Sequence, residues 1–291
     1  MSEIFWQSDT NFWTIINGKI DTIELGTKTI AETEKCTPIG AYTSFRTYNS
    51  FGVLRLEQHF DRLEETARLA GFDIQLDRED LRNTLVTLIA GTPNSSEPTP
   101  ERRIRITIDL EKHIGRLYFA MEPLKVPSPE KYEQGIICQT AKAQRDNPKA
   151  KLSNFLSRAA DIREQEKDEF DEILMVSPHD DLLEGLSSNF FGIKGDTVYT
   201  AEEGVLSGTT RDFILHLAEE LGIPVVFKAV KIDEIADLDE AFISSTSRAI
   251  LPIRLIDGIS MKESIPGPVT KRLMEKFDQE LSSGIESLFV N

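Results

Sequence analysis

Hydrophobic residues recur at helical spacing in two segments of the first 120 or so positions. One segment runs from Leu56 to Ala70 and ends at Gly71, and the other covers residues 78–90. Between and around them, short runs of alternating apolar and polar residues predict strands. These expected strands are a hairpin over residues 14–20 that turns at Asn17-Gly18, and segments 41–48, 104–108 and 116–120. The pattern predicts a small α/β domain.

The rest of the chain is richer in strand patterns. Strands expected at residues 136–140 and 173–176 flank a helix with apolar residues from Leu152 to Ile162. Another helix pattern from Phe213 to Leu221 stops at Gly222, and a C-terminal one covers residues 269–281. Further strands are expected in a hairpin over residues 190–200 and in segments 225–230, 241–245 and 253–257. This pattern predicts a larger, strand-rich α/β domain.

A proline-rich stretch separates the two patterns. Residues 122–129 contain three prolines, which disfavour regular structure and are typical of a linker. A length of 291 residues also suits two domains better than one core. We therefore expect a small domain over residues 1–121, a linker over 122–130 and a large domain over 131–291.

Charge and cysteine content narrow the classes of function. The formal net charge is −16, from 49 acidic and 33 basic residues, so nucleic acid and anionic membranes are not expected as partners. Cys36 and Cys138 have no paired spacing, which predicts neither a disulfide framework nor a metal site. No secretory or membrane-spanning pattern occurs. These features predict a cytoplasmic protein that acts on small molecules.

Lysine residues near position 150 are candidate nucleophiles. Lys151 precedes the helix pattern that begins near Leu152, directly after an expected strand. A lysine that is desolvated or close to other cations forms Schiff bases with carbonyl compounds. Lys149 is an alternative nucleophile, and a solvated lysine in a basic patch with Lys142 and Arg145 is another interpretation of the segment.

A glutamate follows the second expected strand of the large domain. Glu184 lies between Leu183 and Gly185. A carboxylate in such a position can keep a pyridine nitrogen protonated, which turns the ring into an electron sink. The alternative is a turn glutamate. His179, Asp180 and Asp181, just before it, indicate a solvated hairpin tip rather than a metal site.

Three hydroxyl-rich or basic segments could bind a phosphate. Gly208-Thr209-Thr210 opens a helix, where free N–H groups and the positive helix end attract anions. Ser244-Ser-Thr-Ser247 follows an expected strand, and Arg62 stands one turn after His59. The alternatives are an ordinary helix cap and a surface ion pair of Arg62 with Asp61, Glu64 or Glu65.

Together these motifs resemble the fold-type IV family of pyridoxal-phosphate enzymes. The segments that carry the resemblance are Glu184-Gly-Leu-Ser-Ser-Asn-Phe-Phe191, Leu206-Ser-Gly-Thr-Thr-Arg211 and Phe242-Ile-Ser-Ser-Thr-Ser-Arg-Ala-Ile-Leu-Pro-Ile253. Members include branched-chain and D-amino-acid aminotransferases and aminodeoxychorismate lyases. The family's Lys-x-x-Asn pattern is matched by Lys151 and Asn154, so the resemblance selects Lys151 over Lys149.

The resemblance implies roles for individual residues. Lys151 would form the Schiff base, Glu184 would pair with the pyridine nitrogen, and Leu206 would press on the ring. The residues expected to bind the phosphate are Arg62, Gly208, Thr209, Thr210, Ser245 and Thr246, and those expected to line the substrate pocket are Tyr42, Arg46, Arg105 and Ser247. The family also implies a cofactor held between two domains of an α/β fold, and a homodimer.

Departures from the family pattern leave the substrate open. Asp109-Leu-Glu-Lys-His113 stands where D-amino-acid aminotransferases carry an arginine loop. Phe155 replaces a tyrosine of branched-chain enzymes, and Thr43 replaces a common glutamate. We expect transamination between an amino acid or amine and a 2-keto acid. A lyase of the aminodeoxychorismate type and a non-catalytic binder of a phosphorylated ligand are the alternatives.

Overall fold

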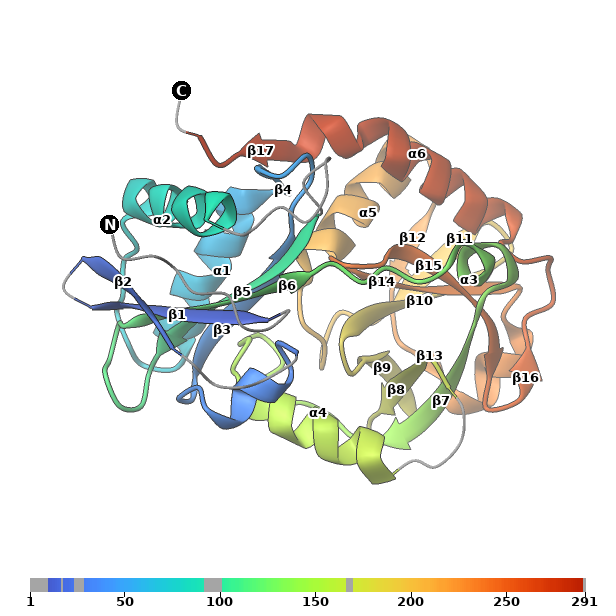
Figure 1. Ribbon diagram of the computed structural model, residues 1–291. Coiled ribbons are helices and arrows are strands. Elements are labelled where there is room, and N and C mark those ends of the chain that lie inside the picture. The colour runs from blue at the N-terminus through green and yellow to red at the C-terminus, as the bar shows by residue number, and fades with distance from the viewer. Residues whose placement is uncertain (1–9, 17, 24–28, 92–100, 166–169, 290–291) are drawn as a thin grey trace. The chain divides into compact units, whose positions relative to one another are not determined.

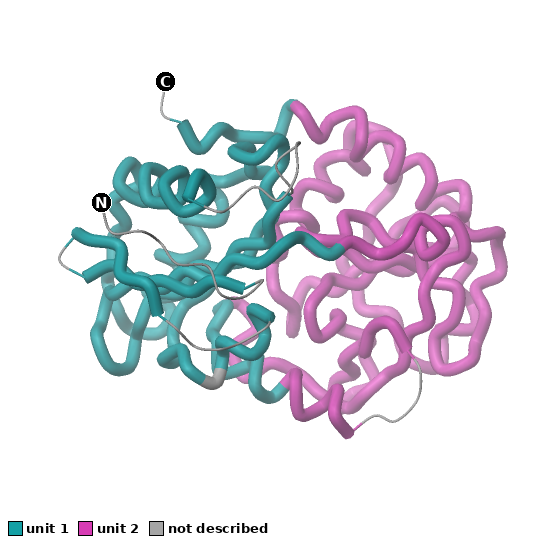
Figure 2. Tube along the Cα trace, viewed as in Figure 1, with its two compact units in different colours: residues 1–125, 150–158, 283–291 teal, residues 126–149, 159–282 magenta. Residues whose placement is uncertain are grey.

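A computed structural model describes residues 10–16, 18–23, 29–91, 101–165 and 170–289. The chain forms two compact units (Figure 2). Unit 1 comprises residues 1–125, 150–158 and 283–291, and unit 2 comprises residues 126–149 and 159–282. The sequence predicts domains that are each one continuous stretch, whereas both compact units here are discontinuous along the chain. The domain boundaries drawn from the sequence stay a prediction.

Unit 1 contains a five-stranded antiparallel sheet. Its strands, in spatial order, are β2 (Lys19–Thr22), β1 (Asn11–Ile16), β6 (Leu117–Pro123), β5 (Arg102–Asp109) and β3 (Gly40–Arg46). The expected hairpin and the three expected strands are therefore confirmed, although Asn17 lies outside the described residues. Because β3 is an end strand of this sheet, one of its edges is open to pairing by other segments.

Two helices cover one face of this sheet. They are α1 (Leu56–Leu69) and α2 (Arg78–Ala90), as the hydrophobic spacing predicts (Figure 1). Alternate residues of the strands point at the helices, and the two sets of side chains form one apolar core. This core includes Trp13, Phe45, Ile106 and Phe119 of the sheet and Leu56, Phe60, Leu63 and Leu85 of the helices.

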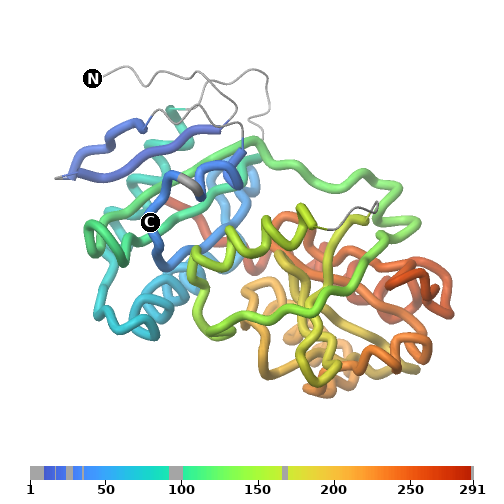
Figure 3. The backbone as a smooth tube through the Cα atoms, turned by 90° about the horizontal axis from the view of Figure 1, so that it is seen from below, coloured from blue at the N-terminus to red at the C-terminus, as the bar shows by residue number. Residues whose placement is uncertain are grey.

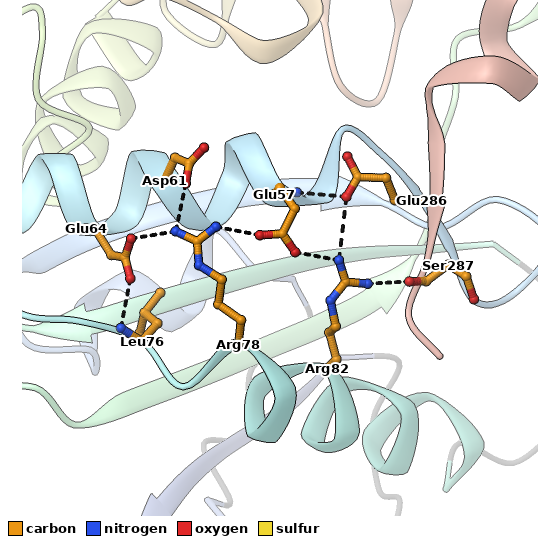
Figure 4. Close-up of polar contacts among 8 residues, drawn as sticks. All are labelled: Glu57, Asp61, Glu64, Leu76, Arg78, Arg82, Glu286 and Ser287. Carbon is orange, nitrogen blue, oxygen red and sulfur yellow. Dashed lines mark hydrogen bonds and ion pairs between the residues drawn. The ribbon is translucent and has the colours of Figure 1, made fainter. Parts of the chain in front are cut away.

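Arginine residues of α2 bind carboxylates on α1 and on the C-terminal segment. Figure 4 shows Arg78 reaching Glu57, Asp61 and Glu64, all on α1. Arg82 binds Glu57 and lies 3.6 Å from the Glu286 carboxylate. Glu286 belongs to β17 (Ile285–Ser287), which pairs with β4 (Gly52–Leu54) just before α1. These contacts fix the orientation of α1, the helix that carries His59 and Arg62.

Unit 2 is built on a large mixed sheet. Its main path is β12 (Val225–Phe227), β11 (Thr197–Thr200), β10 (Ser188–Lys194), β14 (Glu240–Ser245), β15 (Ala249–Ile256), β7 (Ile136–Lys142), β8 (Glu172–Val176), β9 (Asp181–Gly185) and β13 (Val230–Lys231), with β16 (Ile259–Ser260) beside β15. A further pairing of β9 with β10 joins two strands of this path, and it places Glu184 opposite Asn189.

The longer of the remaining helices lie where strong hydrophobic spacing predicts them. Strands β7 and β8 run parallel, and the segment between them contains α4 (Asn154–Gln165), which Figure 3 shows following β7 along the chain. The other elements are α3 (Pro129–Gln134), α5 (Thr209–Glu220), α6 (Pro268–Gly284) and the 3-10 helices at Glu32–Lys35 and Ile232–Asp237. The expected helices over 213–221 and 269–281 are thus confirmed.

Three strand predictions need correction. The single strand expected over residues 225–230 is two strands, because the chain turns at Lys228 and β12 and β13 pair with different neighbours. Strand β15 begins at Ala249 rather than at Ile253, and it includes Pro252 although proline cannot donate to a ladder. Strand β9 was not expected, because Leu182-Leu183 is too short an apolar run to reveal it.

Candidate active site

The backbone of Lys151 lies along the open edge of β3 in unit 1. The Tyr42 N–H donates to the Lys151 carbonyl at 3.0 Å, and Ala41 forms a bridge with Leu152. The Ser153 N–H donates to the Gly40 carbonyl, and the Ser153 hydroxyl accepts from the Gly40 N–H, both at 2.9 Å. Residues 151–153 are therefore bonded to β3 just before α4, which fixes the origin of the Lys151 side chain.

The Lys151 side chain lies beside Tyr42 and near two residues of α1. Its Nζ is 5.1 Å from the centre of the Tyr42 ring. His59 is completely buried, and its Nδ1 is 2.8 Å from the Thr43 hydroxyl. Burial lowers the pKa of His59 well below its ordinary value, and the positive charges of Arg62 and Lys151 lower it further. Unit 1 therefore brings the charges of Lys151 and Arg62 close to a neutral histidine.

The acidic residues that could compete for Arg62 are occupied by other arginines. Asp61 and Glu64 accept hydrogen bonds from Arg78, at 2.7 Å and 2.6 Å. Glu65 accepts from Arg68 one turn along the helix, at 2.6 Å. These three carboxylates thus bind arginines other than Arg62 in the contacts described, and the role of Arg62 toward a phosphate stays a prediction.

The other substrate-pocket candidates of unit 1 lie on the sheet face opposite to α1 and α2. Tyr42, Ser44 and Arg46 alternate along β3, and Ser44 pairs with Arg105 across the β3–β5 ladder. The Arg105 guanidinium carbon is 5.2 Å from the centre of the Tyr42 ring. Tyr42, Arg46 and Arg105 therefore lie on one face of the sheet, and their role in a substrate pocket stays a prediction.

Glu184 lies in strand β9 of unit 2 and is buried. Its Oε1 accepts from Arg145 Nε at 2.7 Å, and its Oε2 accepts from Asn189 Nδ2 and the Leu206 N–H, both at 3.1 Å. The side chains of Arg145 and Glu184 are only 6% and 2% exposed. Three donors thus fix the carboxylate in an environment of low dielectric constant, where hydrogen bonds to charge are strong.

The start of α5 fits the phosphate of the expected cofactor. Gly208 stands before the helix in an extended conformation, and no side chain caps the first turn. The Thr209 hydroxyl is buried and has no hydrogen-bond partner in the described part of unit 2. A Cβ on Gly208 would lie 2.1 Å from Asn189 Oδ1, so only glycine fits there. Helix N–H groups with an unsatisfied hydroxyl suit an anion with several acceptor oxygens.

The Ser245-Thr246-Ser247 turn is held by a buried ion pair. The Ser245 hydroxyl accepts from Arg248 Nε at 2.9 Å, and Arg248 Nη2 donates to Glu172 Oε2 at 2.8 Å. Glu172 is almost completely buried and also accepts from the Ser187 and Ser188 hydroxyls. One carboxylate therefore joins this turn to Ser187, in the loop after β9, and to Ser188 at the start of β10.

Sequence reasoning did not assign a role to several of these residues. Arg145 was noted only as part of a basic patch, and its partner Glu184 is 39 positions away. Asn189 belongs to the segment that carries the family resemblance and could have been singled out there. Arg248 belongs to another such segment and His59 to the motif with Arg62, whereas Glu172 gave no signal of its own.

In the described part of the chain, no three His, Cys, Asp or Glu side chains gather in a way that could hold a metal ion. No helix in the segments that the structure describes is long and apolar enough to span a lipid bilayer.

The matching family model is "Amino-transferase class IV", and it covers residues 40–256. A probable branched-chain-amino-acid aminotransferase of Thermotoga maritima is 28% identical over 251 residues, which cover 84% of this chain and 87% of that protein. A D-alanine aminotransferase of Bacillus licheniformis is 28% identical over 274 residues, with 84% and 88% covered.

Solved structures show the same fold. A putative branched-chain amino acid aminotransferase from Thermotoga maritima superimposes with a TM-score of 0.76 at 23% identity, over 93% of this chain and 95% of that one. The branched-chain enzyme from Thermobaculum terrenum, in its pyridoxal-phosphate form, gives 0.74 at 22% identity, over 96% and 98%. The two-unit α/β structure is thus that of a fold-type IV enzyme.

The chain belongs to the class IV aminotransferase family. Enzymes of this family use pyridoxal phosphate, and the residues at the start of α5 fit its phosphate group. The protein is accordingly a pyridoxal-phosphate-dependent transaminase that acts on amino acids and keto acids.

Proposed function

We propose that Lys151 is the residue that carries the cofactor covalently and that moves the proton during transamination. The observation that supports this assignment most directly is the fixed position of Lys151 in unit 1. Its backbone is bonded to β3, and its amine lies beside Tyr42 and near Arg62 and the neutral His59. Such a lysine has a defined direction of approach to a bound carbonyl group.

Residues of unit 2 would bind the rest of the cofactor. Pyridoxal phosphate supplies an electron sink when bound, because its protonated ring stabilises charge at the reacting carbon. Glu184, held by Arg145, would accept a hydrogen bond from the ring nitrogen, and Leu206 would contact the ring face. The phosphate would be bound by the N–H and hydroxyl groups of Gly208, Thr209, Thr210, Ser245 and Thr246, and by Arg62.

The proposed substrates are amino acids with neutral side chains and the matching 2-keto acids. Relatives at similar identity are named for branched-chain amino acids and for D-alanine, all with apolar side chains, and the second name specifies a D enantiomer. Tyr42 offers an apolar ring beside Lys151, and Ser247 offers a hydroxyl in the turn after β14. The handedness of the product is therefore the property to measure first.

We also propose that the protein is a homodimer and that it is cytoplasmic. The resemblance to fold-type IV enzymes implies a homodimer, and the composition is typical of a cytoplasmic protein. Light scattering of the purified protein reports the oligomeric state directly, and a value equal to the mass of one chain, 32.8 kDa, would contradict the dimer.

A half-reaction tests transamination against the alternatives. Holoenzyme mixed with an amino donor and no acceptor should lose its visible absorbance once, in proportion to enzyme, and a 2-keto acid should restore it. A lyase would release an elimination product over many turnovers without acceptor. A binder would do neither. Donors should include both enantiomers of alanine, leucine and valine, so that the same experiment reports handedness.

A further inference from the structure

Three arginines lie on the face of the unit 1 sheet that is turned away from α1 and α2. Arg46 comes from β3, and Arg103 and Arg105 come from β5. The ladder pairs Arg46 with Arg103 and Ser44 with Arg105, so all three side chains leave the same face. Cations this close on one sheet face repel one another unless anions lie between them.

Each of these arginines binds a carboxylate of the same chain. Arg46 binds Glu101, Arg103 binds Glu122, and Arg105 binds Glu34. The Arg105–Glu34 pair is the most enclosed of the three, since its side chains are 7% and 12% exposed and its N–O distance is 2.8 Å. A buried pair of this kind is held strongly, because separating it would leave a charge out of water without a partner.

The segment that carries Glu34 is anchored to the sheet. Ile30 is completely buried and packs with Phe12, Tyr118 and Ala120. Its N–H donates to the Glu122 carboxylate at 2.8 Å, and its carbonyl accepts from the Thr33 hydroxyl at 2.7 Å. The 3-10 helix Glu32–Lys35 follows directly. The position of Glu34 beside Arg105 is therefore fixed by the packing and hydrogen bonds of the segment that carries it.

Tyr42 connects this ion pair with the reactive amine. The Arg105 guanidinium lies 5.2 Å from the centre of the Tyr42 ring, and the Lys151 amine lies 5.1 Å from the same ring. A substrate that reacts beside Lys151 would therefore lie close to Tyr42 and, past this ring, to a guanidinium that binds carboxylates. In this chain, the Arg105 guanidinium already binds the Glu34 carboxylate.

We propose that Glu34 acts as a built-in counter-ion that occupies the carboxylate site at Arg105 and so excludes substrates with a second carboxylate. This inference rests on the proposed function of Lys151. It assigns the enzyme to neutral amino acids and monocarboxylic 2-keto acids such as pyruvate. Arg105 is then a specificity-determining residue, and its ion pair with Glu34 sets which substrates the enzyme accepts.

The physical argument is a competition between two carboxylates. A dicarboxylate substrate can bind Arg105 only if it displaces Glu34, which would leave a buried carboxylate without its cation. A neutral substrate leaves the pair intact. When Glu34 is made neutral, Arg105 keeps its charge and lacks a full counter-charge, so a substrate carboxylate should bind it with a charge-assisted hydrogen bond.

The test is a gain of function in Glu34→Gln. The ratio of kcat/KM for 2-oxoglutarate to that for pyruvate should rise about ten- to a hundredfold, since a charge-assisted hydrogen bond contributes a factor of this order. Calorimetry of the holoenzyme with glutarate, an unreactive dicarboxylate, should show tighter binding by a similar factor. Misfolding of the variant could lower both values but could not raise them.

Two matched variants make the result specific. Glu32→Gln removes an exposed carboxylate from the same 3-10 helix and should leave both values within about twofold of the wild type, as exposed charges contribute little. Arg105→Gln added to Glu34→Gln should abolish the gain. An unchanged glutarate affinity in Glu34→Gln, or a gain that survives the loss of Arg105, would overturn the inference. Because glutarate binding needs no turnover, failure of transamination would be seen separately.

Discussion

The ion pair between Arg145 and Glu184 provides the sharpest test of how the cofactor-binding part of unit 2 is held. Both side chains are nearly inaccessible, at 6% and 2% exposure, and the N–O distance is 2.7 Å. Replacing Arg145 by Met would remove this cation from a buried carboxylate that also accepts from Asn189 and the Leu206 N–H. We expect the free energy of unfolding of the cofactor-free protein to fall by about 3–5 kcal/mol, as it does when one member of a buried pair is removed.

Denaturant unfolding of four proteins measures this effect: wild type, Arg145→Met, Glu184→Gln and the double variant. The double variant should recover most of the stability lost in Arg145→Met, because the neutral amide that replaces the Glu184 carboxylate no longer needs a cation. Saturating pyridoxal phosphate should also reduce the loss in Arg145→Met, since the ring nitrogen would give Glu184 a second positive partner. A loss below about 1 kcal/mol, typical of an exposed pair, would refute the reasoning, and so would additive losses in the double variant.

Three other predictions concern His59, Glu172 and Arg62. The pKa of His59 is depressed, so below pH 6.5, its ordinary pKa, the unfolded chain binds a proton that the folded chain does not. The free energy of unfolding should therefore fall by about 1.4 kcal/mol per pH unit as the pH drops below 6.5. His59→Gln should remove this slope in thermal unfolding between pH 6.5 and pH 5. Burial alone would raise the pKa of Glu172, but Arg248 and Arg163 outweigh burial and lower the pKa below 4.5. The ionised Glu172 therefore stabilises the fold above pH 4.5, and this contribution is lost as the pH falls through the pKa of the folded state. Acid denaturation of Glu172→Gln should lack this step, and an unchanged acid transition would contradict the argument. Arg62→Ala should weaken pyridoxal-phosphate binding about ten- to a hundredfold in a cofactor titration, whereas Arg68→Ala, which removes an exposed arginine of the same helix, should not.

Much of the fold could be predicted from the sequence because its signals are local. The helix over Leu56–Leu69 has apolar residues at each turn, and Arg78–Ala90 begins after Asp77, whose side chain accepts a hydrogen bond from the Asp80 N–H. Strand β9 was missed because its apolar run is only Leu182-Leu183 between charged residues. Glu184 therefore could be interpreted as a turn residue from the sequence, whereas the structure places it inside a strand.

The site was harder to predict because its contacts join distant positions. Glu184 and Arg145 are 39 residues apart, and Arg105 and Glu34 are 71 apart, so no spacing rule relates them. The choice of Lys151 over Lys149 depended on the Lys-x-x-Asn resemblance and not on the chemistry of either lysine. The sequence also did not show that residues 151–153 are hydrogen-bonded to β3, and the choice of Lys151 stays a prediction.

The most direct test of the account is to locate the lysine that carries the cofactor. Holoenzyme reduced with borohydride, digested and analysed by mass spectrometry should have its pyridoxyl group on the peptide with Lys151, and Lys151→Ala should bind the cofactor without being labelled. Lys149→Ala should be labelled like the wild type. A pyridoxyl group on Lys149, or a wild-type protein that gains no visible absorbance with pyridoxal phosphate, would contradict the central claim.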